Sequence, residues 1–138
     1  MVCISKRSFL KIKRGDTAPA LCVQLGEWVD GSFVLTDLDL TDCVFTFYLQ
    51  KLDDLTYDPV VTEPVLRLPG TLVSNVDKSV VYEWKEINTI NRLGFYDLEL
   101  EVIFPNGVYK SWPTEDRETI VHFVEDIDDR PGATFVTE

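Results

Sequence analysis

Hydrophobic and polar side chains alternate with a period of two along much of this chain, most clearly over residues 94–104. There, Tyr96, Leu98 and Leu100 fall on one face, and Asp97 and Glu99 fall on the other. Alternation of this kind is typical of a β-strand with one buried and one solvated face, whereas an amphipathic helix repeats every 3.6 residues. The pattern therefore predicts strands rather than helices.

Turn signals separate the alternating stretches. Asn106-Gly107 follows residues 94–104 and precedes a second alternating stretch at 108–112. Asn-Gly supplies the two positive-φ residues of a type I′ turn, so we expect a β-hairpin with this turn. A second hairpin is predicted at Asp77-Lys78, between strands over 71–76 and 79–84. A third is expected over 28–35, with its tip at Asp30-Gly31.

Further strands are expected over residues 9–13, 20–25, 43–51 and 119–124. The last of these is apolar on both faces, which indicates a central position in a sheet. Residues 85–92 favour one short turn over a helix, because they contain Asn and Thr. Residues 53–69, with three prolines, are expected to be irregular. Seven or eight short strands with turns between them indicate an all-β, two-sheet antiparallel sandwich.

The chain has 138 residues, of which 45% are hydrophobic and 27% are charged, so it is long enough to build one packed domain. We assign this domain to residues 1–128. We expect residues 129–138, which include Arg130-Pro131-Gly132, to form an extended C-terminal arm that leaves the domain. No apolar run approaches the roughly 18 residues of a membrane span, so membrane insertion is not expected.

Charge is distributed unevenly along the chain. There are 24 acidic and 13 basic residues, giving a net charge of −11, which argues against a nucleic-acid partner. Five basic residues precede the first acidic one, Asp16, whereas residues 115–138 contain eight acidic residues and only two basic ones. The opposite charges suggest that the two ends meet, within one chain or between copies. Lys11, Lys13 and Arg14 are therefore candidate partner contacts, although basic residues also protect the exposed edge of a strand.

No catalytic constellation is evident. His122, the only histidine, is in phase with Ile120 and Val124, which favours a packed strand residue over a general base. We expect no enzymatic activity, no cofactor and no metal. Two acidic clusters are candidate calcium sites. The first contains Asp37, Asp39 and Asp42, and the second contains Asp126 and Asp128. Solvated loops without a bound metal often have the same acidic composition. The three cysteines form no CxxC pair and are expected to be reduced, with Cys22 and Cys43 in apolar segments.

Several aromatic residues lie in or beside predicted loops, namely Trp28, Tyr57, Tyr109 and Trp112. Exposed rings at such positions stack on sugars, which makes Trp28, Tyr57 and Trp112 candidate contacts for a carbohydrate, a receptor or a protein partner. The alternative is that these rings are anchors of the core, since Trp and Tyr usually bury most of their area.

The order of several short motifs resembles the N-terminal domain of phage baseplate upper proteins, over residues 9–127. The motifs are Phe9-x-x-x-x-Arg14-Gly15-Asp16-Thr17, Leu21-x-Val23-x-Leu25, Leu38-x-Leu40-Thr41-x-x-x-Phe45-x-Phe47, Val81-Tyr82-x-Trp84, Gly94-x-Tyr96-x-x-Glu99-x-x-x-x-Phe104-x-Asn106-Gly107 and Ser111-Trp112-Pro113. Leu93 departs from the small residue that usually precedes the glycine of the hairpin motif.

This resemblance implies an immunoglobulin-like sandwich without enzymatic activity. It implies a structural or adaptor protein of a tailed phage virion, assembled in the host cytoplasm, that joins tail, baseplate or fibre components. The expected partners are other virion proteins and copies of the same chain. A carbohydrate- or receptor-binding module that uses the loop aromatics is the alternative.

Overall fold

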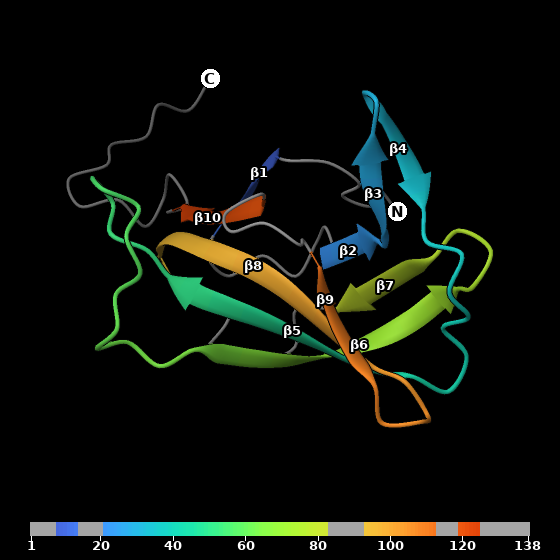
Figure 1. The fold of residues 1–138 in the computed structure, drawn as a ribbon. Helices are drawn as coiled ribbons and strands as arrows, with labels where there is room; N and C mark the ends of the chain where they lie inside the picture. Colours follow the sequence, from blue (N-terminus) through green and yellow to red (C-terminus); the bar gives the residue numbers. More distant parts are fainter. Residues whose placement is uncertain (1–7, 14–20, 83–92, 113–118, 125–138) are drawn as a thin grey trace, which may run out of the picture.

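The computed structural model describes residues 8–13, 21–82, 93–112 and 119–124, and its regular elements there are all β-strands (Figure 1). The strands are β1 (Ser8–Lys13), β2 (Leu21–Gln24), β3 (Gly26–Val29), β4 (Ser32–Leu35), β5 (Val44–Lys51), β6 (Leu66–Ser74), β7 (Ser79–Tyr82), β8 (Gly94–Ile103), β9 (Tyr109–Trp112) and β10 (Thr119–Val124). The all-β prediction is confirmed. Within these ranges no helix is long and apolar enough to cross a membrane.

Eight of these strands form one curled sheet, and β3 and β4 form a separate two-stranded sheet. The order in the large sheet is β1-β10-β8-β5-β6-β7-β2, with β9 also paired to β8. Every pairing is antiparallel except that of β1 with β10. β10 therefore lies between two neighbours, as its two apolar faces predicted. The first and last strands meet within one molecule, with Lys11 in register with His122 and Lys13 with Val124.

β6 changes partner along its length. Its first part, residues 66–70, pairs with β5, and residues 71–74 pair with β7. Gly70 lies where the partner changes. A Cβ atom at this position would lie 2.9 Å from Phe45 Cβ and 2.9 Å from Val80 Cγ1. Glycine therefore allows the backbone of β6 to approach both β5 and β7 closely at the point where the sheet curls.

One hydrophobic cluster forms the core, and strands from β10 to β2 in the order of the large sheet contribute to it. Alternate residues of β5 and β8 point inward and are buried, including Phe47, Leu49 and Leu100. They belong to one hydrophobic cluster with residues of β2 and β7, such as Leu21 and Val80. Fully burying a side chain of this size stabilises the fold by about 1.5–3 kcal/mol, so the alternation seen in the sequence directs the sheet to curl around this cluster.

All three predicted hairpins form, but only the turn at Asp30-Gly31 is as predicted. At the tip of the β3–β4 hairpin, Asp30 has a φ of 49° and Gly31 a φ of 80°, as a type I′ turn requires. In the turn between β8 and β9 only Gly107, with a φ of 88°, has a positive φ. Its N–H donates to the Phe104 carbonyl at 2.9 Å, as in a type I turn followed by a bulge. Pro105 favours this turn because its ring fixes φ near −65°.

The boundaries of β6 also differ from the prediction. β6 begins at Leu66, within the segment expected to be irregular, and its turn into β7 covers residues 75–78 rather than two residues. Pro69 is tolerated in this strand because the first part of β6 pairs with β5 alone in the described structure. The turn at 85–92 and the arm at 129–138 lie outside the described residues.

The expectation of reduced cysteines is wrong for one residue. Cys22 is disulfide-bonded, whereas Cys43 is a free thiol. Cys22 is buried at the start of β2, as its apolar neighbours predicted.

Candidate functional site

A groove lies between the β3–β4 hairpin, the segment that follows it and β9, and its volume is about 370 Å³. The hairpin is attached to the large sheet at its base. Leu25 N donates to the Lys78 carbonyl at 2.8 Å, and Thr36 N donates to the Leu25 carbonyl at 2.9 Å. β3 and β4 pair only with each other among the described strands, and the hairpin extends away from the large sheet (Figure 1).

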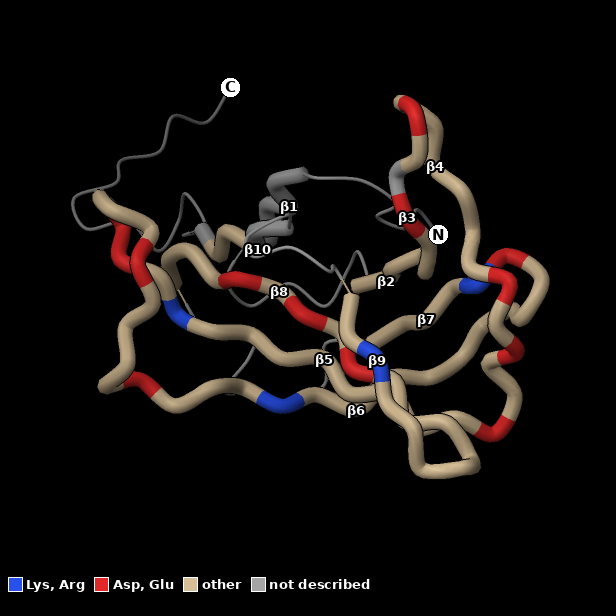
Figure 2. Tube along the Cα trace, viewed as in Figure 1, with Lys and Arg blue, Asp and Glu red and all other residues tan. Residues whose placement is uncertain are grey.

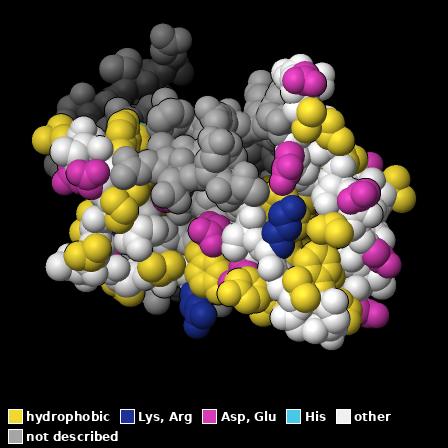
Figure 3. All heavy atoms as spheres, viewed as in Figure 1, with side chains coloured by type: hydrophobic (Ala, Val, Ile, Leu, Met, Phe, Trp, Pro, Cys, Tyr) yellow, Lys and Arg dark blue, Asp and Glu magenta, His cyan; other side chains and the backbone are white. Residues whose placement is uncertain are grey.

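The walls of the groove are largely aliphatic. Val29 and Val34 each expose about half of their surface, at 50% and 51%, and Leu35 and Leu38 are also exposed. Hydrophobic side chains lie among acidic and basic ones on this side of the molecule (Figure 3). Large exposed apolar side chains that share one concave surface are typical of an interaction site, whereas scattered ones are not.

Trp112 also lines the groove, but its ring belongs to the core. It is 4% exposed, and its Nε1 is buried with no hydrogen-bond partner in the part of the chain that the structure describes. Lys110 Nζ lies 5.0 Å from the centre of the ring and 3.5 Å from Glu27 Oε1. Lys110 therefore links β9 to β3 across the groove. Because this ion pair is exposed, it contributes at most about 1 kcal/mol.

Among the calcium candidates, Asp37 lines the groove, whereas Asp39 has a structural role. Asp39 Oδ1 accepts hydrogen bonds from Thr41 N at 3.0 Å, from Thr41 Oγ1 at 2.7 Å and from Asn75 Nδ2 at 2.8 Å. The bonds from Thr41, and then that from Asn75, lower the pKa of Asp39 below its ordinary value. Asp42 follows in the same loop, which joins the hairpin to β5.

Asn75 connects this loop to the β6–β7 turn. Its Oδ1 accepts a hydrogen bond from Leu40 N at 3.0 Å, and Lys78 Nζ donates to the same oxygen at 3.1 Å and to the Leu38 carbonyl at 2.7 Å. These contacts hold Leu38 in place at the groove. No group of three His, Cys, Asp or Glu side chains suited to a metal occurs in the described ranges, and Asp126 and Asp128 lie outside them.

Tyr57 lies away from the groove, in an aromatic row. Its ring contacts Phe95 edge to face at 5.2 Å, and Phe95 stacks on His122 at 3.9 Å with an interplanar angle of 16°. His122 is thus a packed strand residue, as predicted. Tyr57 has a φ of 57°, and it is half-buried.

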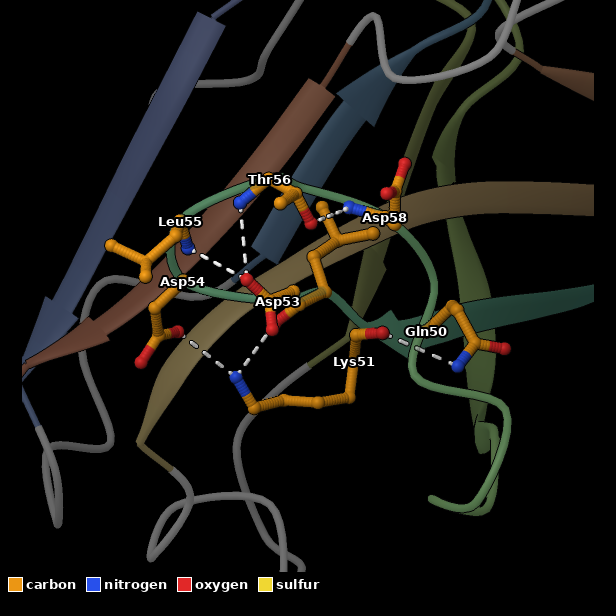
Figure 4. Close-up of polar contacts among 8 residues, drawn as sticks. Gln50, Lys51, Asp53, Asp54, Leu55, Thr56 and Asp58 are labelled. Atoms are coloured by element: carbon orange, nitrogen blue, oxygen red, sulfur yellow. Dashed lines mark hydrogen bonds and ion pairs between the residues drawn. The ribbon is translucent and has the colours of Figure 1, made fainter.

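The loop before Tyr57 is held by its own side chains (Figure 4). Asp53 Oδ1 accepts hydrogen bonds from Leu55 N at 2.9 Å and Thr56 N at 3.0 Å, and these bonds lower the pKa of Asp53. Lys51 Nζ donates to the Leu52 carbonyl at 2.8 Å and pairs with Asp54 at 3.1 Å. These contacts are local turn contacts, and they account for the acidic residues of this loop without a ligand.

A second apolar surface lies on the outer face of the large sheet. Val44, Ile103 and Tyr109 are cross-strand neighbours on β5, β8 and β9, and all three are exposed. Sequence reasoning missed this row and the aliphatic walls of the groove. The available signal was an apolar residue at a position that alternation assigns to the solvated face, as with Ile103 beside the inward-facing Val102.

The structure places the remaining contact candidates as follows. Trp28 lies in β3, in register with Phe33, within the hairpin that borders the groove. Lys11 and Lys13 lie on β1, at one end of the strand order, and Arg14 lies outside the described residues. Acidic positions are more numerous than basic ones along the described chain, particularly in the loop after β4 (Figure 2).

The fold and these surfaces define an all-β protein with an apolar groove and an apolar outer row. Comparison of the sequence with models of known protein families, and with curated proteins, finds no match.

Proposed function

We propose that this chain is a non-enzymatic structural or adaptor protein of a tailed phage virion, which connects tail, baseplate or fibre components through protein–protein contacts. The observation that carries the proposal is the position of the family-like motifs in the fold. In order, they contribute to β2, β5, β7 and the β8–β9 hairpin. The apolar residues of these motifs, such as Phe47, Tyr82 and Tyr96, are buried in one hydrophobic cluster.

Within this proposal the fold is an immunoglobulin-like sandwich. The strand order is compatible with that class. The first strand is parallel to the last, and β6 pairs with β5 along its first part and with β7 along its second part. A single hydrophobic cluster contains residues of β5 and β8 together with residues of β2 and β7, which also supports two packed layers. A sandwich of this kind offers edges, loops and outer faces for assembly.

The groove and the outer row supply surfaces suited to protein partners. Both are apolar and accessible, and both have charged neighbours, which is the composition of many protein interfaces. The proposed partners are other virion proteins, including further copies of this chain, and the proposed location is the virion.

Mass spectrometry of purified particles of the phage that encodes the chain tests this proposal. The chain should co-purify with the particles through density-gradient sedimentation and remain after protease-free washing at high salt. Particles that lack the polypeptide, although it is produced in the infected cell, would overturn it.

The alternative, a carbohydrate- or receptor-binding module, is favoured by one observation. Tyr109 is 69% exposed beside the β8–β9 turn, where its ring can stack on a sugar. Trp112 does not add to such a site, because its ring is buried. A glycan array probed with the whole chain and with Tyr109→Ala separates the two functions: sugar binding that Tyr109→Ala abolishes supports this alternative, and no binding at millimolar sugar excludes it.

A further inference from the structure

We propose that the groove between the β3–β4 hairpin and β9 receives an extended segment of a partner virion protein in which a lysine or arginine stands beside aliphatic residues. This inference rests on the proposed function, because it assumes that the chain acts through protein contacts. Beyond the proposed function, the inference identifies the surface that makes the contact and the kind of side chains that the partner presents to it.

The shape of the groove favours an extended segment. Five consecutive residues, 34–38, line it, so an extended segment can lie alongside them. Its volume of about 370 Å³ suits a few side chains rather than a folded domain. In addition, β3 and β4 pair only with each other among the described strands, which leaves hydrogen-bonding groups on their outer edges for another strand.

The walls select aliphatic side chains. Val29, Val34 and Leu35 are exposed in the free chain and would lose water on contact with an apolar group. A sugar fits this surface poorly, because sugar sites present exposed aromatic rings. The aromatic ring described in this groove, that of Trp112, is 4% exposed and has Lys110 over its face.

The charges select a basic side chain. Lys110 is already engaged, with Glu27 at 3.5 Å and with the ring of Trp112 at 5.0 Å. Asp37 is one of the residues that line the groove, and its carboxylate forms no ion pair with the residues that the structure describes. It therefore remains available for a cation, and the net charge of −11 attracts a basic segment toward it.

Peptide titration of the whole chain tests this inference. The probes are fluorescein-labelled peptides of sequence Gly-Ser-Val-Lys-Val-Ser-Gly, the same peptide with Glu in place of Lys, and the same peptide with Gly in place of both Val residues. Fluorescence anisotropy at low salt should show saturable binding of the first peptide alone. Asp37→Asn should weaken binding by about two- to fivefold at low salt, because an exposed charge pair has a small effect.

Val34→Ser should weaken binding of the same peptide without unfolding the chain, because Val34 is half exposed. Matched controls are Glu63→Gln and Val61→Ser, which change exposed residues of another loop and should leave binding unchanged. Circular dichroism confirms that each variant is folded.

No saturable binding up to millimolar peptide, or equal losses in the groove and control variants, would overturn the inference. Equal binding of the Lys and Glu peptides would also overturn it. These failures are distinguishable from failure of the proposed function, which depends on whether the chain is found in purified particles.

Discussion

Replacing Gly70 with alanine tests how the sheet curls around the core. The added Cβ would lie 2.9 Å from Phe45 Cβ, 2.9 Å from Val80 Cγ1 and 3.1 Å from Phe47 Cε2. Ordinary carbon–carbon contacts lie at about 3.5–4.0 Å. All three neighbours are buried, so none can move into solvent. The backbone itself tolerates alanine, because Gly70 does not have a positive φ.

The expected magnitude follows from two opposing effects. Overpacking a close-packed core costs about 1–3 kcal/mol. Replacing glycine by alanine lowers the entropy of the unfolded chain and returns about 0.4–1 kcal/mol. Gly70→Ala should therefore lower the free energy of unfolding by about 1–2 kcal/mol, measured by urea unfolding followed by circular dichroism. The midpoint of thermal unfolding should fall by about 3–10 °C.

Gly107 provides a matched control with a different cause of strain. A Cβ there meets nothing within 4 Å, but the φ of 88° disfavours alanine. Asparagine tolerates a positive φ better than alanine, so Gly107→Asn should be less destabilising than Gly107→Ala. At Gly70 the order should reverse, because asparagine is larger. A Gly70→Ala variant as stable as the wild type, or the same order at both positions, would refute the close approach of β6 to β5 and β7.

Three further predictions concern the loop that joins β4 to β5 and its contact with the β6–β7 turn. Asn75→Ala should lower the free energy of unfolding by about 1–3 kcal/mol in urea, because it leaves Leu40 N–H without its acceptor; an unchanged value would contradict this. The lowered pKa of Asp39 gives stability that is present above the unfolded-state pKa and is lost as pH falls through the folded-state pKa. Asp39→Asn should therefore flatten the loss of stability measured between about pH 5 and pH 2, and an equally steep loss would argue against those hydrogen bonds. Burial, and then Asp39 and Asp42, raise the pKa of Cys43, so iodoacetamide at pH 8 should modify the folded chain at Cys43 more slowly than the urea-unfolded chain. Asp42→Asn should speed this reaction, and equal rates in all three samples would contradict the account.

The strands could largely be predicted from the sequence because alternation reports directly which residues face the core. Tyr96 and Leu98 illustrate this for β8. The start of β6 could not be predicted, because Pro69 and Gly70 read as strand breakers when taken alone. Each is tolerated for a tertiary reason: Pro69 lies where β6 pairs with β5 alone, and Gly70 lies where β6 approaches buried side chains.

The candidate site was less predictable than the fold. The sequence indicated Asp37 as a calcium candidate and Trp112 as a contact for a sugar or a protein partner. It did not indicate that both residues line one groove. Their common groove depends on a hairpin that stands apart from the large sheet and on β9, which is more than seventy residues later in the chain. Local periodicity carries no information about that distance. Burial of Trp112 likewise depends on packing between segments, so its exposure could not be inferred from its position beside a predicted loop.

The central claim is that the chain acts inside a virion through protein contacts at the groove. Its most direct test is photo-crosslinking in assembled phage particles, with a photoreactive amino acid at position 34 in the groove and, as a control, at position 61. We predict a crosslink from position 34 to another virion structural protein, at a segment with a basic residue beside aliphatic ones, and none to that segment from position 61. Particles that contain the chain but give no crosslink from position 34, or the same crosslinks from both positions, would contradict the claim.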